Sequence, residues 1–297
     1  MYPRAFSYHR AGSLQEASAL LSQLGGEAKL LAGGQSLIPL MKLRFANPAH
    51  LVDLNFINGL SYIRRENGTL VFGPMTRHAH IEHSADVQKI PILYDCAAGI
   101  ADVQVRNQGT IGGSVAEADP SGDWAPVLLT LDTEVKISGT NGSRGVKLND
   151  FIQDAYTTVL AHDELITEIR VKAPAKNSGG AYIAFKRTAP VYATASAAVQ
   201  LTLKGGTCSD AKIYLGAVAL TPVHATSAED ELRGRPLDGS SIARAAEAAM
   251  SAVDPPPDMR GTAEYKRVLV GGLVRRAIEA AARRARGEHV EASHIYA

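Results

Sequence analysis

Two glycine-containing segments, Ala32-Gly-Gly-Gln-Ser36 and Thr110-Ile-Gly-Gly-Ser114, carry the residue types best suited to chemistry in this chain. Adjacent glycines let the backbone approach a ligand closely and adopt positive φ without a steric penalty. The successive backbone N–H groups of such a loop form a concave site for phosphate oxygens. One such segment is weak evidence, but two of like chemistry predict two subdomains that grip one diphosphate from opposite sides. The pair therefore indicates a dinucleotide site.

The first segment does not have the spacing of the common nicotinamide-dinucleotide fingerprint. That fingerprint places G-x-G-x-x-G directly after a strand, with an acidic residue about 20 positions further on. Here Gly33 and Gly34 are adjacent and the third glycine is missing, although Asp53 lies where the acidic residue would be expected. The spacing therefore disfavours a Rossmann NAD enzyme.

The second segment lies within a longer polar run, Gln104 to Asp123. If Gly112 to Ser114 hold phosphate oxygens, Asp123 is near enough in sequence to reach a sugar hydroxyl. The alternative is that Asp123 caps a helix that begins at Trp124, because aspartate is a favoured N-cap residue. The adjoining glycine segment favours the ligand role.

Cysteine and histidine usage limits the metal chemistry that this chain can support by itself. Cys96 and Cys208 are its two cysteines, whereas an iron–sulfur cluster usually takes four thiolates. We expect both to be buried free thiols. His78, His80 and His83 do not share one face of a helix, so a polar helix surface is expected there rather than a metal site.

Overall charge and hydropathy exclude several other classes of protein. Lys plus Arg number 31 against 30 for Asp plus Glu, so no basic field attracts nucleic acid or an acidic membrane. No apolar run approaches the roughly 20 residues that span a bilayer. The first residues lack the apolar segment of a signal peptide. We therefore expect a cytoplasmic protein with no membrane span.

Hydrophobic patterning and turn signals predict a chain of mixed helices and strands that opens with a β-α-β unit. The capping box Ser13-Leu-Gln-Glu16 predicts the start of a helix that ends at Gly25-Gly26, and Asn67-Gly68 predicts a hairpin turn. Strands are expected at 2–8, 29–32, 50–54, 62–65, 70–72, 134–137, 146–148, 165–171, 196–203 and 211–220. Further helices are expected at 37–43, after the cap Thr76, at 91–98 and 124–131, after Ser240-Ser241, and from 262 to about 286.

The polar link 174–180 is a plausible domain boundary. We therefore divide the chain into 1–57 and 58–175, two lobes of one binding domain, and a C-terminal domain, 176–297. The last helix places Tyr265, Leu269, Leu273, Ala277 and Ala281 on one face. Its arginines (Arg275, Arg276, Arg283, Arg284 and Arg286) could contact an acidic partner, but most are expected to be solvated or to lie against neighbouring surface.

A resemblance to one known family is carried by the two glycine segments, by Met41-Lys-Leu-Arg44, by the run Gln104 to Asp123 and by Phe185-Lys-Arg187. Together they resemble the FAD-binding medium subunit of molybdenum hydroxylases, the relatives of carbon monoxide dehydrogenase and xanthine dehydrogenase. The resemblance covers essentially the whole chain. It implies a two-lobed α+β FAD-binding domain of the vanillyl-alcohol oxidase/MurB type, followed by a C-terminal α/β domain with a small antiparallel sheet and helices.

The resemblance also implies which residues bind FAD. The FAD diphosphate would lie against both glycine segments, and Asp123 would bond a ribose or flavin-side hydroxyl. Lys186 would lie near the flavin ring or ribityl chain, and Tyr192 would cover one face of the ring; taken alone, these two would be a surface lysine and a core aromatic. Ile100 and Ile166 would add backbone or apolar contacts. The complete set is Ala32, Gly33, Gly34, Gln35, Ser36, Ile100, Thr110, Ile111, Gly112, Gly113, Ser114, Asp123, Ile166, Lys186 and Tyr192.

Two departures from the family pattern refine this expectation. Covalently flavinylated relatives can carry histidine where Gln35 stands, and an amide has no ring nitrogen to bond the flavin, so FAD is expected to be noncovalent. Some members insert a cysteine-rich iron–sulfur segment into this subunit, and two cysteines exclude that here.

The function implied is that of an electron-transfer subunit. A large partner subunit would hold the molybdenum cofactor, and a small one the [2Fe–2S] clusters. Electrons would reach FAD from these clusters and leave to an external acceptor such as a quinone, NAD or oxygen, in a dimer of heterotrimers. The alternatives are a self-contained flavin oxidase or reductase of the same fold, and an assembly subunit that has lost the cofactor. The sequence does not identify the hydroxylated substrate, the acceptor or the stoichiometry.

Overall fold

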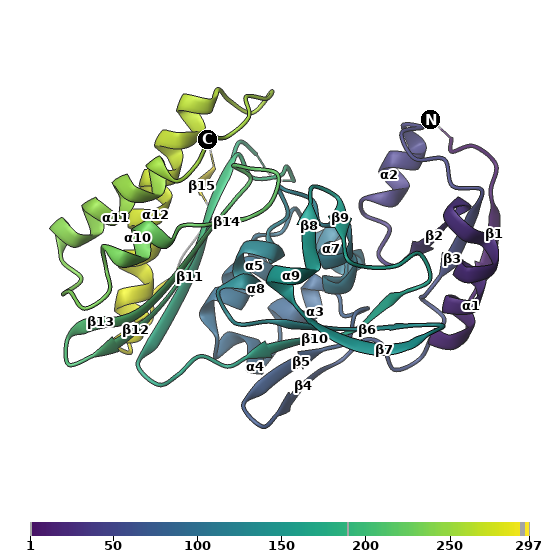
Figure 1. Ribbon diagram of the computed structural model, residues 1–297, viewed down its shortest axis with the longest axis horizontal. Coiled ribbons are helices and arrows are strands. Elements are labelled where there is room, and N and C mark those ends of the chain that lie inside the picture. The colour runs from purple at the N-terminus through teal and green to yellow at the C-terminus, as the bar shows by residue number, and fades with distance from the viewer. Residues whose placement is uncertain (1, 189, 292–294, 297) are drawn as a thin grey trace.

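The computed structural model describes residues 2–188 and 190–291, and the backbone of 295–296. Its strands form three main sheets that follow one another along the long axis of the molecule, from the N-terminal part to the C-terminal part (Figure 1). Helices pack against each sheet. This mixture of segregated helices and largely antiparallel sheets is an α+β architecture.

The first sheet is small and parallel. Its strands are β1 (Ser7–Arg10), β2 (Ala28–Leu31) and β3 (His50–Asp53), in the order β1-β3-β2. Helix α1 (Leu14–Leu24), the short 3-10 helix η1 (Gly25–Glu27) and α2 (Leu37–Lys42) make the connections that parallel strands require. Ser13 caps α1 as expected, by accepting a hydrogen bond from the backbone N–H of Glu16.

The second sheet has the strand order β4-β5-β10-β6-β7 and is antiparallel. The hairpin turn at Asn67-Gly68 has positive φ at both residues, as expected for this dipeptide. The strands are β4 (Ile63–Glu66), β5 (Thr69–Phe72), β6 (Glu134–Gly139), β7 (Gly142–Lys147) and β10 (Leu165–Lys172), and a separate short pair is β8 (Ile152–Asp154) with β9 (Thr157–Thr158).

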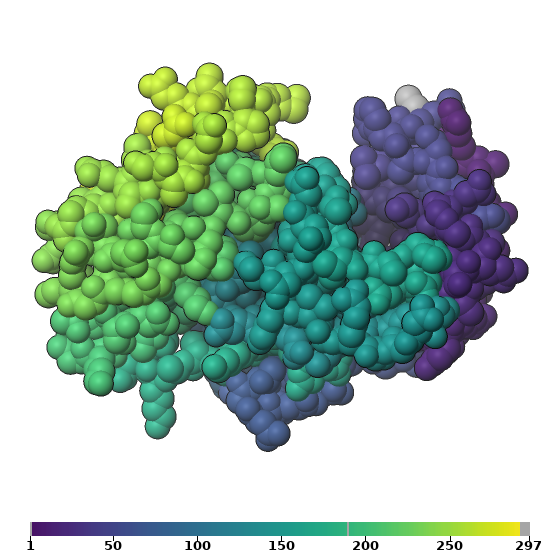
Figure 2. Space-filling view, viewed as in Figure 1, coloured from purple at the N-terminus to yellow at the C-terminus, as the bar shows by residue number. Residues whose placement is uncertain are grey.

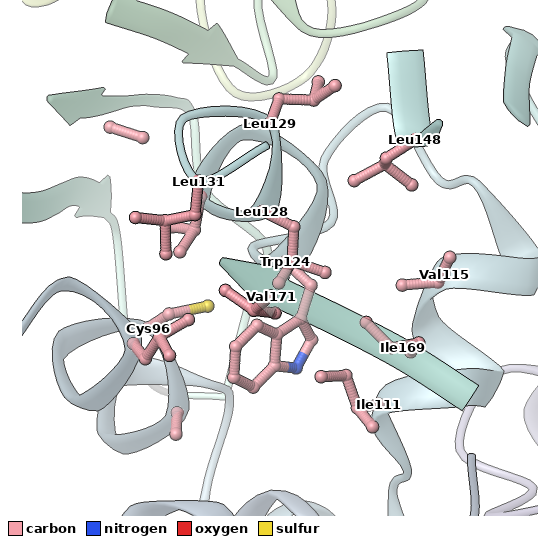
Figure 3. Packing of buried hydrophobic residues seen from close by; sticks show 14 of the residues in the cluster. Cys96, Ile111, Val115, Trp124, Leu128, Leu129, Leu131, Leu148, Ile169 and Val171 are labelled. Atoms are coloured by element: carbon pink, nitrogen blue, oxygen red, sulfur yellow. The ribbon is translucent and has the colours of Figure 1, made fainter. Parts of the chain in front are cut away.

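Short helices cover one face of this sheet and enclose a core around Trp124 (Figures 1 and 3). Trp124 is 1% exposed and packs among the alternate side chains that the sheet directs inward, such as Ile169 and Val171. The helices are α3 (His78–Glu82), α4 (Ala85–Gln88), α5 (Pro91–Gly99), α6 (Val103–Gln108), α7 (Ile111–Glu117), α8 (Trp124–Leu129) and α9 (Leu148–Phe151).

The third sheet is buried on both faces. Along β11, Tyr182 and Ala184 belong to the core of the second sheet, whereas Ala181 and Ile183 face the C-terminal helices. The strand order is β14-β13-β12-β11-β15, with β11 (Ser178–Lys186), β12 (Ala195–Lys204), β13 (Thr207–Gly216), β14 (Val223–His224) and β15 (Ile295–Tyr296). The helices are α10 (Thr226–Asp230), α11 (Gly239–Ser251) and α12 (Ala263–Ala285).

Helix α12 buries most of the face that the sequence predicts. Leu273, Ala277 and Ala281 lie in the core, while Tyr265 at the start of the helix remains 43% exposed. One arginine departs from the expected solvated surface: Arg284 turns inward and forms a buried ion pair with Asp95 of α5. This pair fastens the C-terminal helix to the second sheet's helices.

Three local expectations are wrong. The second glycine segment is the first turn of helix α7 rather than a loop, because Thr110 takes an N-cap conformation. Thr76 does not cap a helix, since its hydroxyl hydrogen-bonds with Tyr62 and the N-cap of α3 is Arg77. The strand expected over residues 2–8 extends only from Ser7, where pairing with β3 begins.

Within the described residues, no helix combines the length and the apolar character needed to cross a bilayer.

Candidate dinucleotide-binding site

A cleft of about 660 Å³ lies where the three parts of the molecule meet. Figure 2 shows the surface hollowed between the residues around α2 and those around β8 and β9. This volume is typical of small-molecule and cofactor sites. Thirteen of the fifteen predicted binding residues line it, namely Ala32, Gly33, Gly34, Gln35, Ser36, Ile100, Thr110, Gly112, Gly113, Ser114, Asp123, Ile166 and Tyr192.

The structure does not bring Ile111 and Lys186 to the cleft wall. The side chain of Ile111 is fully buried in the core around Trp124 (Figure 3). Lys186 is 1% exposed and lies behind Asp123. Any influence of Lys186 on a ligand is therefore indirect.

The two glycine segments approach each other directly at the cleft. A Cβ atom added to Gly33 would lie 2.4 Å from the carbonyl oxygen of Gln108 and 2.8 Å from the Cα of Gly109. On the other side, a Cβ on Gly113 would lie 3.8 Å from the Cβ of Ala32. Two segments far apart in sequence thus form one continuous wall.

The first segment offers a row of free backbone donors. The N–H groups of Gly33, Gly34, Gln35 and Ser36 have no hydrogen-bond acceptor within the described part of the chain. Gly34 has φ of +71°, a conformation that glycine adopts freely. Because unpaired N–H groups need a partner, this loop is well suited to bind an anion.

The second segment differs, and the expectation of a second row of free N–H groups is wrong. Ile111 donates its N–H to the carbonyl of Thr76, and Gly112 donates to the carbonyl of Pro74. Gly113 and Ser114 donate to the side chain and the carbonyl of Thr110. What this segment presents to the cleft is close backbone packing and hydroxyl groups rather than a concave donor site.

Asp123 has a buried but well-partnered carboxylate at the cleft wall. Tyr182 donates its hydroxyl to Oδ1 at 2.7 Å, and the Lys186 ammonium lies 3.2 Å from Oδ1 and 3.3 Å from Oδ2. Lys186 also donates to the carbonyl of Gly99 at 2.7 Å. Although Asp123 occupies the N-cap position of α8, its side chain makes no capping bond. The alternative that it serves as a helix cap is therefore wrong.

Tyr192 belongs to the segment between β11 and β12 and faces the cleft from the C-terminal part of the molecule. Partial burial raises the pKa of its hydroxyl, and the negative charge of Asp119 raises it further. The guanidinium of Arg260 lies 5.7 Å from the Tyr192 ring centroid. The ring is 43% exposed, so it is not a core residue.

His78 is also part of the cleft wall, which the sequence did not suggest. It is 5% exposed rather than on a polar helix surface, whereas His80 and His83 are not buried. Its Nδ1 accepts a hydrogen bond from the indole N–H of Trp124 at 3.1 Å, and burial lowers its pKa to about 4. His78 is therefore neutral at physiological pH.

No three His, Cys, Asp or Glu side chains of the described chain come together in a way that would hold a metal ion. Cys96 and Cys208 are buried free thiols, as expected. Asp53, at the spacing of a Rossmann ribose carboxylate, does not line the cleft and instead accepts a hydrogen bond from Tyr8 at 2.5 Å.

Sequence reasoning missed the residues that support the cleft from behind. Tyr182 holds Asp123, Asn55 bonds the backbone of the first glycine segment, and Arg77 bonds the backbone just before the second. No short motif marks these residues. The one available signal was the position of Asn55, just after a strand that lies beside the strand leading to Ala32.

Two family models match this chain. The model described as "FAD binding domain in molybdopterin dehydrogenase" matches residues 4–174, and "CO dehydrogenase flavoprotein C-terminal domain" matches residues 180–281. The first ends just after β10, and the second begins within β11. Together they cover both the cleft and the C-terminal sheet.

Individual relatives agree with these models. The carbon monoxide dehydrogenase medium chain of Afipia carboxidovorans is 43% identical over 287 residues, 96% of this chain and 100% of that protein. A carbon monoxide dehydrogenase chain from Hydrogenophaga pseudoflava superposes with a TM-score of 0.92 at 44% identity, covering 95% of this chain and 98% of that one.

A chain of quinoline 2-oxidoreductase from Pseudomonas putida 86 gives a TM-score of 0.91 at 35% identity and covers 96% of this chain and 99% of that one. The similarity therefore extends along the full length of chains from enzymes named for different substrates. Both family models and all three relatives point the same way: this chain belongs to the family of FAD-binding medium subunits of molybdenum hydroxylases.

Proposed function

We propose that this chain binds FAD in the cleft and acts as the electron-transfer subunit of a molybdenum-containing hydroxylase or dehydrogenase. The observation that carries the proposal is the first glycine loop, whose four N–H groups have no acceptor among the described residues and lie beside the hydroxyl-bearing second segment. Bound FAD would supply the redox chemistry, since it accepts two electrons and can release them to another acceptor. The protein's own residues bind and orient it.

The polar and apolar parts of the cleft fit the parts of a dinucleotide. The N–H groups of Gly33 to Ser36 would hold diphosphate oxygens, with Thr110 and Ser114 adding hydroxyl donors from the adjacent second segment. The Asp123 carboxylate would accept hydrogen bonds from hydroxyl groups of the cofactor. Ile100, Ile166 and Tyr192 would give apolar contacts to a ring system.

Lys186 would act on the cofactor indirectly. Its ammonium lies beside Asp123 and pairs with that carboxylate. We assign the flavin to this part of the cleft because Tyr192 and Asp123 both line it. In this arrangement no side chain is required as a general acid or base.

The division of the chain follows from the same proposal. Residues 1–57 and 58–175 would be two lobes of a vanillyl-alcohol oxidase/MurB-type binding domain, and 176–297 would be the C-terminal domain of the medium subunit. The cleft between the first and second sheets is where a cofactor shared by two lobes would lie.

FAD would be held without a covalent bond. Gln35 lines the cleft and its amide donates to the carbonyl of Gly33 at 3.1 Å, but an amide offers no nucleophilic nitrogen. Acid precipitation of the yellow protein should therefore release all of the flavin into the supernatant. Flavin that remained on the pellet would contradict this assignment.

Partner subunits would supply the remaining cofactors. A large chain would hold the molybdenum cofactor, and a small chain would hold the [2Fe–2S] clusters that deliver electrons to this one. The complex would be a dimer of heterotrimers in the cytoplasm, and its external acceptor would be a quinone, NAD or oxygen.

The test is to purify this chain alone and add FAD. We expect a yellow 1:1 complex that does not turn over organic substrates but is reduced when the partner subunits and their substrate are present. Bleaching of the flavin by a small substrate without partners would instead favour a self-contained oxidase or reductase. A chain that binds no FAD would contradict the proposal.

A further inference from the structure

We propose that Arg77 and Asn55 form a clamp that sets the spacing between the two glycine segments and thereby the affinity for a dinucleotide. The inference rests on the proposed function, because it assigns these residues to the same site. Both are positioning residues: neither lines the cleft.

Asn55 holds the first segment. Its side-chain amide donates to the carbonyl of Ala32 at 2.9 Å, directly before the glycine pair. The same amide donates to Asp53 at 2.7 Å, and Asp53 also accepts the backbone N–H of Asn55 at 2.8 Å. Tyr8 from β1 donates its hydroxyl to the same carboxylate. The amide is thus fixed with its nitrogen toward Ala32 and its oxygen turned toward Arg77.

Arg77 holds the backbone that leads into the second segment and reaches across to the first. One guanidinium nitrogen donates to the carbonyl of Gln108, and the other donates to the side-chain oxygen of Asn55 at 2.6 Å. The backbone N–H of the next residue, His78, also donates to this segment, to the carbonyl of Gly109 at 3.1 Å. A planar guanidinium holds two acceptors at a fixed separation, which a lysine ammonium does not.

The clamp acts where the spacing is tightest. Arg77 bonds the same carbonyl oxygen, that of Gln108, against which Gly33 packs without room for a Cβ. Hydrogen bonds therefore connect Ala32 to Gln108 through Asn55 and Arg77. The packing of Gly33 against Gln108 completes a closed circuit of contacts between the two segments. A ligand that bridges the two segments depends on this separation, whereas a ligand that touches neither segment does not.

The experiment measures FAD and riboflavin affinities of the full-length chain by flavin fluorescence, in wild type, R77M, R77K, N55A and the double variant R77M/N55A. Riboflavin carries no phosphate and serves as the ligand that does not bridge the segments. The matched control is R64M, because Arg64 is a half-exposed arginine that also bridges two acceptors, Glu66 and Glu168, away from the cleft.

We expect R77M to weaken FAD binding about ten- to a hundredfold, the range for lost hydrogen bonds to a charged group. The FAD affinity of R77K should lie between those of wild type and R77M, and N55A should bind FAD about tenfold more weakly than wild type. The double variant should bind FAD no more weakly than R77M, because both residues belong to one chain of hydrogen bonds. Riboflavin affinity should stay within about twofold of wild type in every variant. In R64M, the affinities for FAD and for riboflavin should both stay within that range. A twofold change is no larger than the variation seen between sites that are not energetically coupled.

Two results would overturn the clamp while leaving the proposed function intact. One is unchanged FAD affinity in folded R77M or N55A. The other is an equal loss of FAD and riboflavin affinity, which indicates general disruption of the fold. If R77M does not fold, N55A and R77K decide by the same criteria. A wild-type chain that binds no FAD would remove the proposed function and the clamp together.

Discussion

Gly33 packs against Gln108 backbone to backbone, with 2.4 Å between the carbonyl oxygen of Gln108 and the place where a Cβ of residue 33 would stand. Real Cβ atoms do not approach an oxygen so closely. The glycine is therefore required at this position by the neighbouring segment and not by its own φ, which lies outside the positive region. The contact joins the first sheet's unit to the second at the wall of the cleft.

Replacing Gly33 with alanine should consequently push the two segments apart. We expect the Gly33→Ala chain to lose about 1–3 kcal/mol of unfolding free energy, the usual cost of overpacking, and to bind FAD at least about tenfold more weakly. Gly272 of α12 has nothing within 4 Å of its would-be Cβ. Gly272→Ala should therefore be neutral or slightly stabilising. Urea unfolding and FAD titration check both, and wild-type FAD affinity in Gly33→Ala would contradict the packing argument.

Sequence predicted the main elements because their signals are local. The Ser13 cap, the Asn67-Gly68 turn and the apolar face of α12 each depend on residues that are near one another in the chain. The family assignment is confirmed by the matching models. It could be made from sequence because its motifs are short and contiguous.

The state of the backbone donors could not be predicted in the same way. The N–H of Gly112 is occupied by Pro74 and that of Ile111 by Thr76, and both acceptors come from a segment far earlier in the chain. Likewise, Lys186 reaches Asp123 only because β11 packs on the helices of the second sheet. Non-local pairing decides which polar groups remain free for a ligand. The roles assigned to the fifteen binding residues accordingly stay predictions.

The buried pair Lys186–Asp123 leads to a second prediction. Lys186→Met would leave the Asp123 carboxylate, 7% exposed, without its neighbouring cation, although the Tyr182 hydroxyl would still donate to it. Removing one member of a buried ion pair costs roughly 3–5 kcal/mol. The double variant Lys186→Met/Asp123→Asn removes both charges and should recover a large part of that loss. Urea unfolding of the single and double variants measures the recovery; simple additivity would show that the two groups are not coupled.

A third prediction concerns the contact between α5 and α12. Arg284 donates to both oxygens of Asp95, at 2.6 and 2.9 Å, and also to the carbonyls of Gly180 and Val290. Burial raises the pKa of Asp95, and the arginine opposes that rise. Arg284→Met should therefore cost about 3–5 kcal/mol of unfolding free energy, because it leaves a buried carboxylate without its partner.

The neighbouring residue supplies the control for Arg284. Arg283 is exposed and pairs with Glu288 at the surface, so Arg283→Met should cost less than about 1 kcal/mol. Both variants are compared by chemical unfolding at neutral pH. Equal effects of the two substitutions would show that the buried pair does not fasten the C-terminal helix.

His78 predicts how stability depends on pH. Burial holds its pKa at about 4 in the folded chain against 6.5 ordinarily, so the unfolded chain takes up the proton first as pH falls. His78 makes its full contribution to the unfolding free energy above its ordinary pKa. That contribution, roughly 3 kcal/mol in all, is lost as the pH falls from there to about 4. An asparagine side chain does not titrate, yet its amide oxygen can still accept the Trp124 N–H. We therefore expect His78→Asn to flatten the profile over that range.

The measurement is urea unfolding at a series of pH values between about 4 and 7, the interval set by the folded and unfolded pKa of His78. His80→Asn is the matched control, because His80 lies on the same helix but is not buried. Its variant should keep the wild-type slope. A wild-type slope in His78→Asn would mean that another group is titrating, since the protonation of His78 would then contribute nothing to the loss of stability in acid.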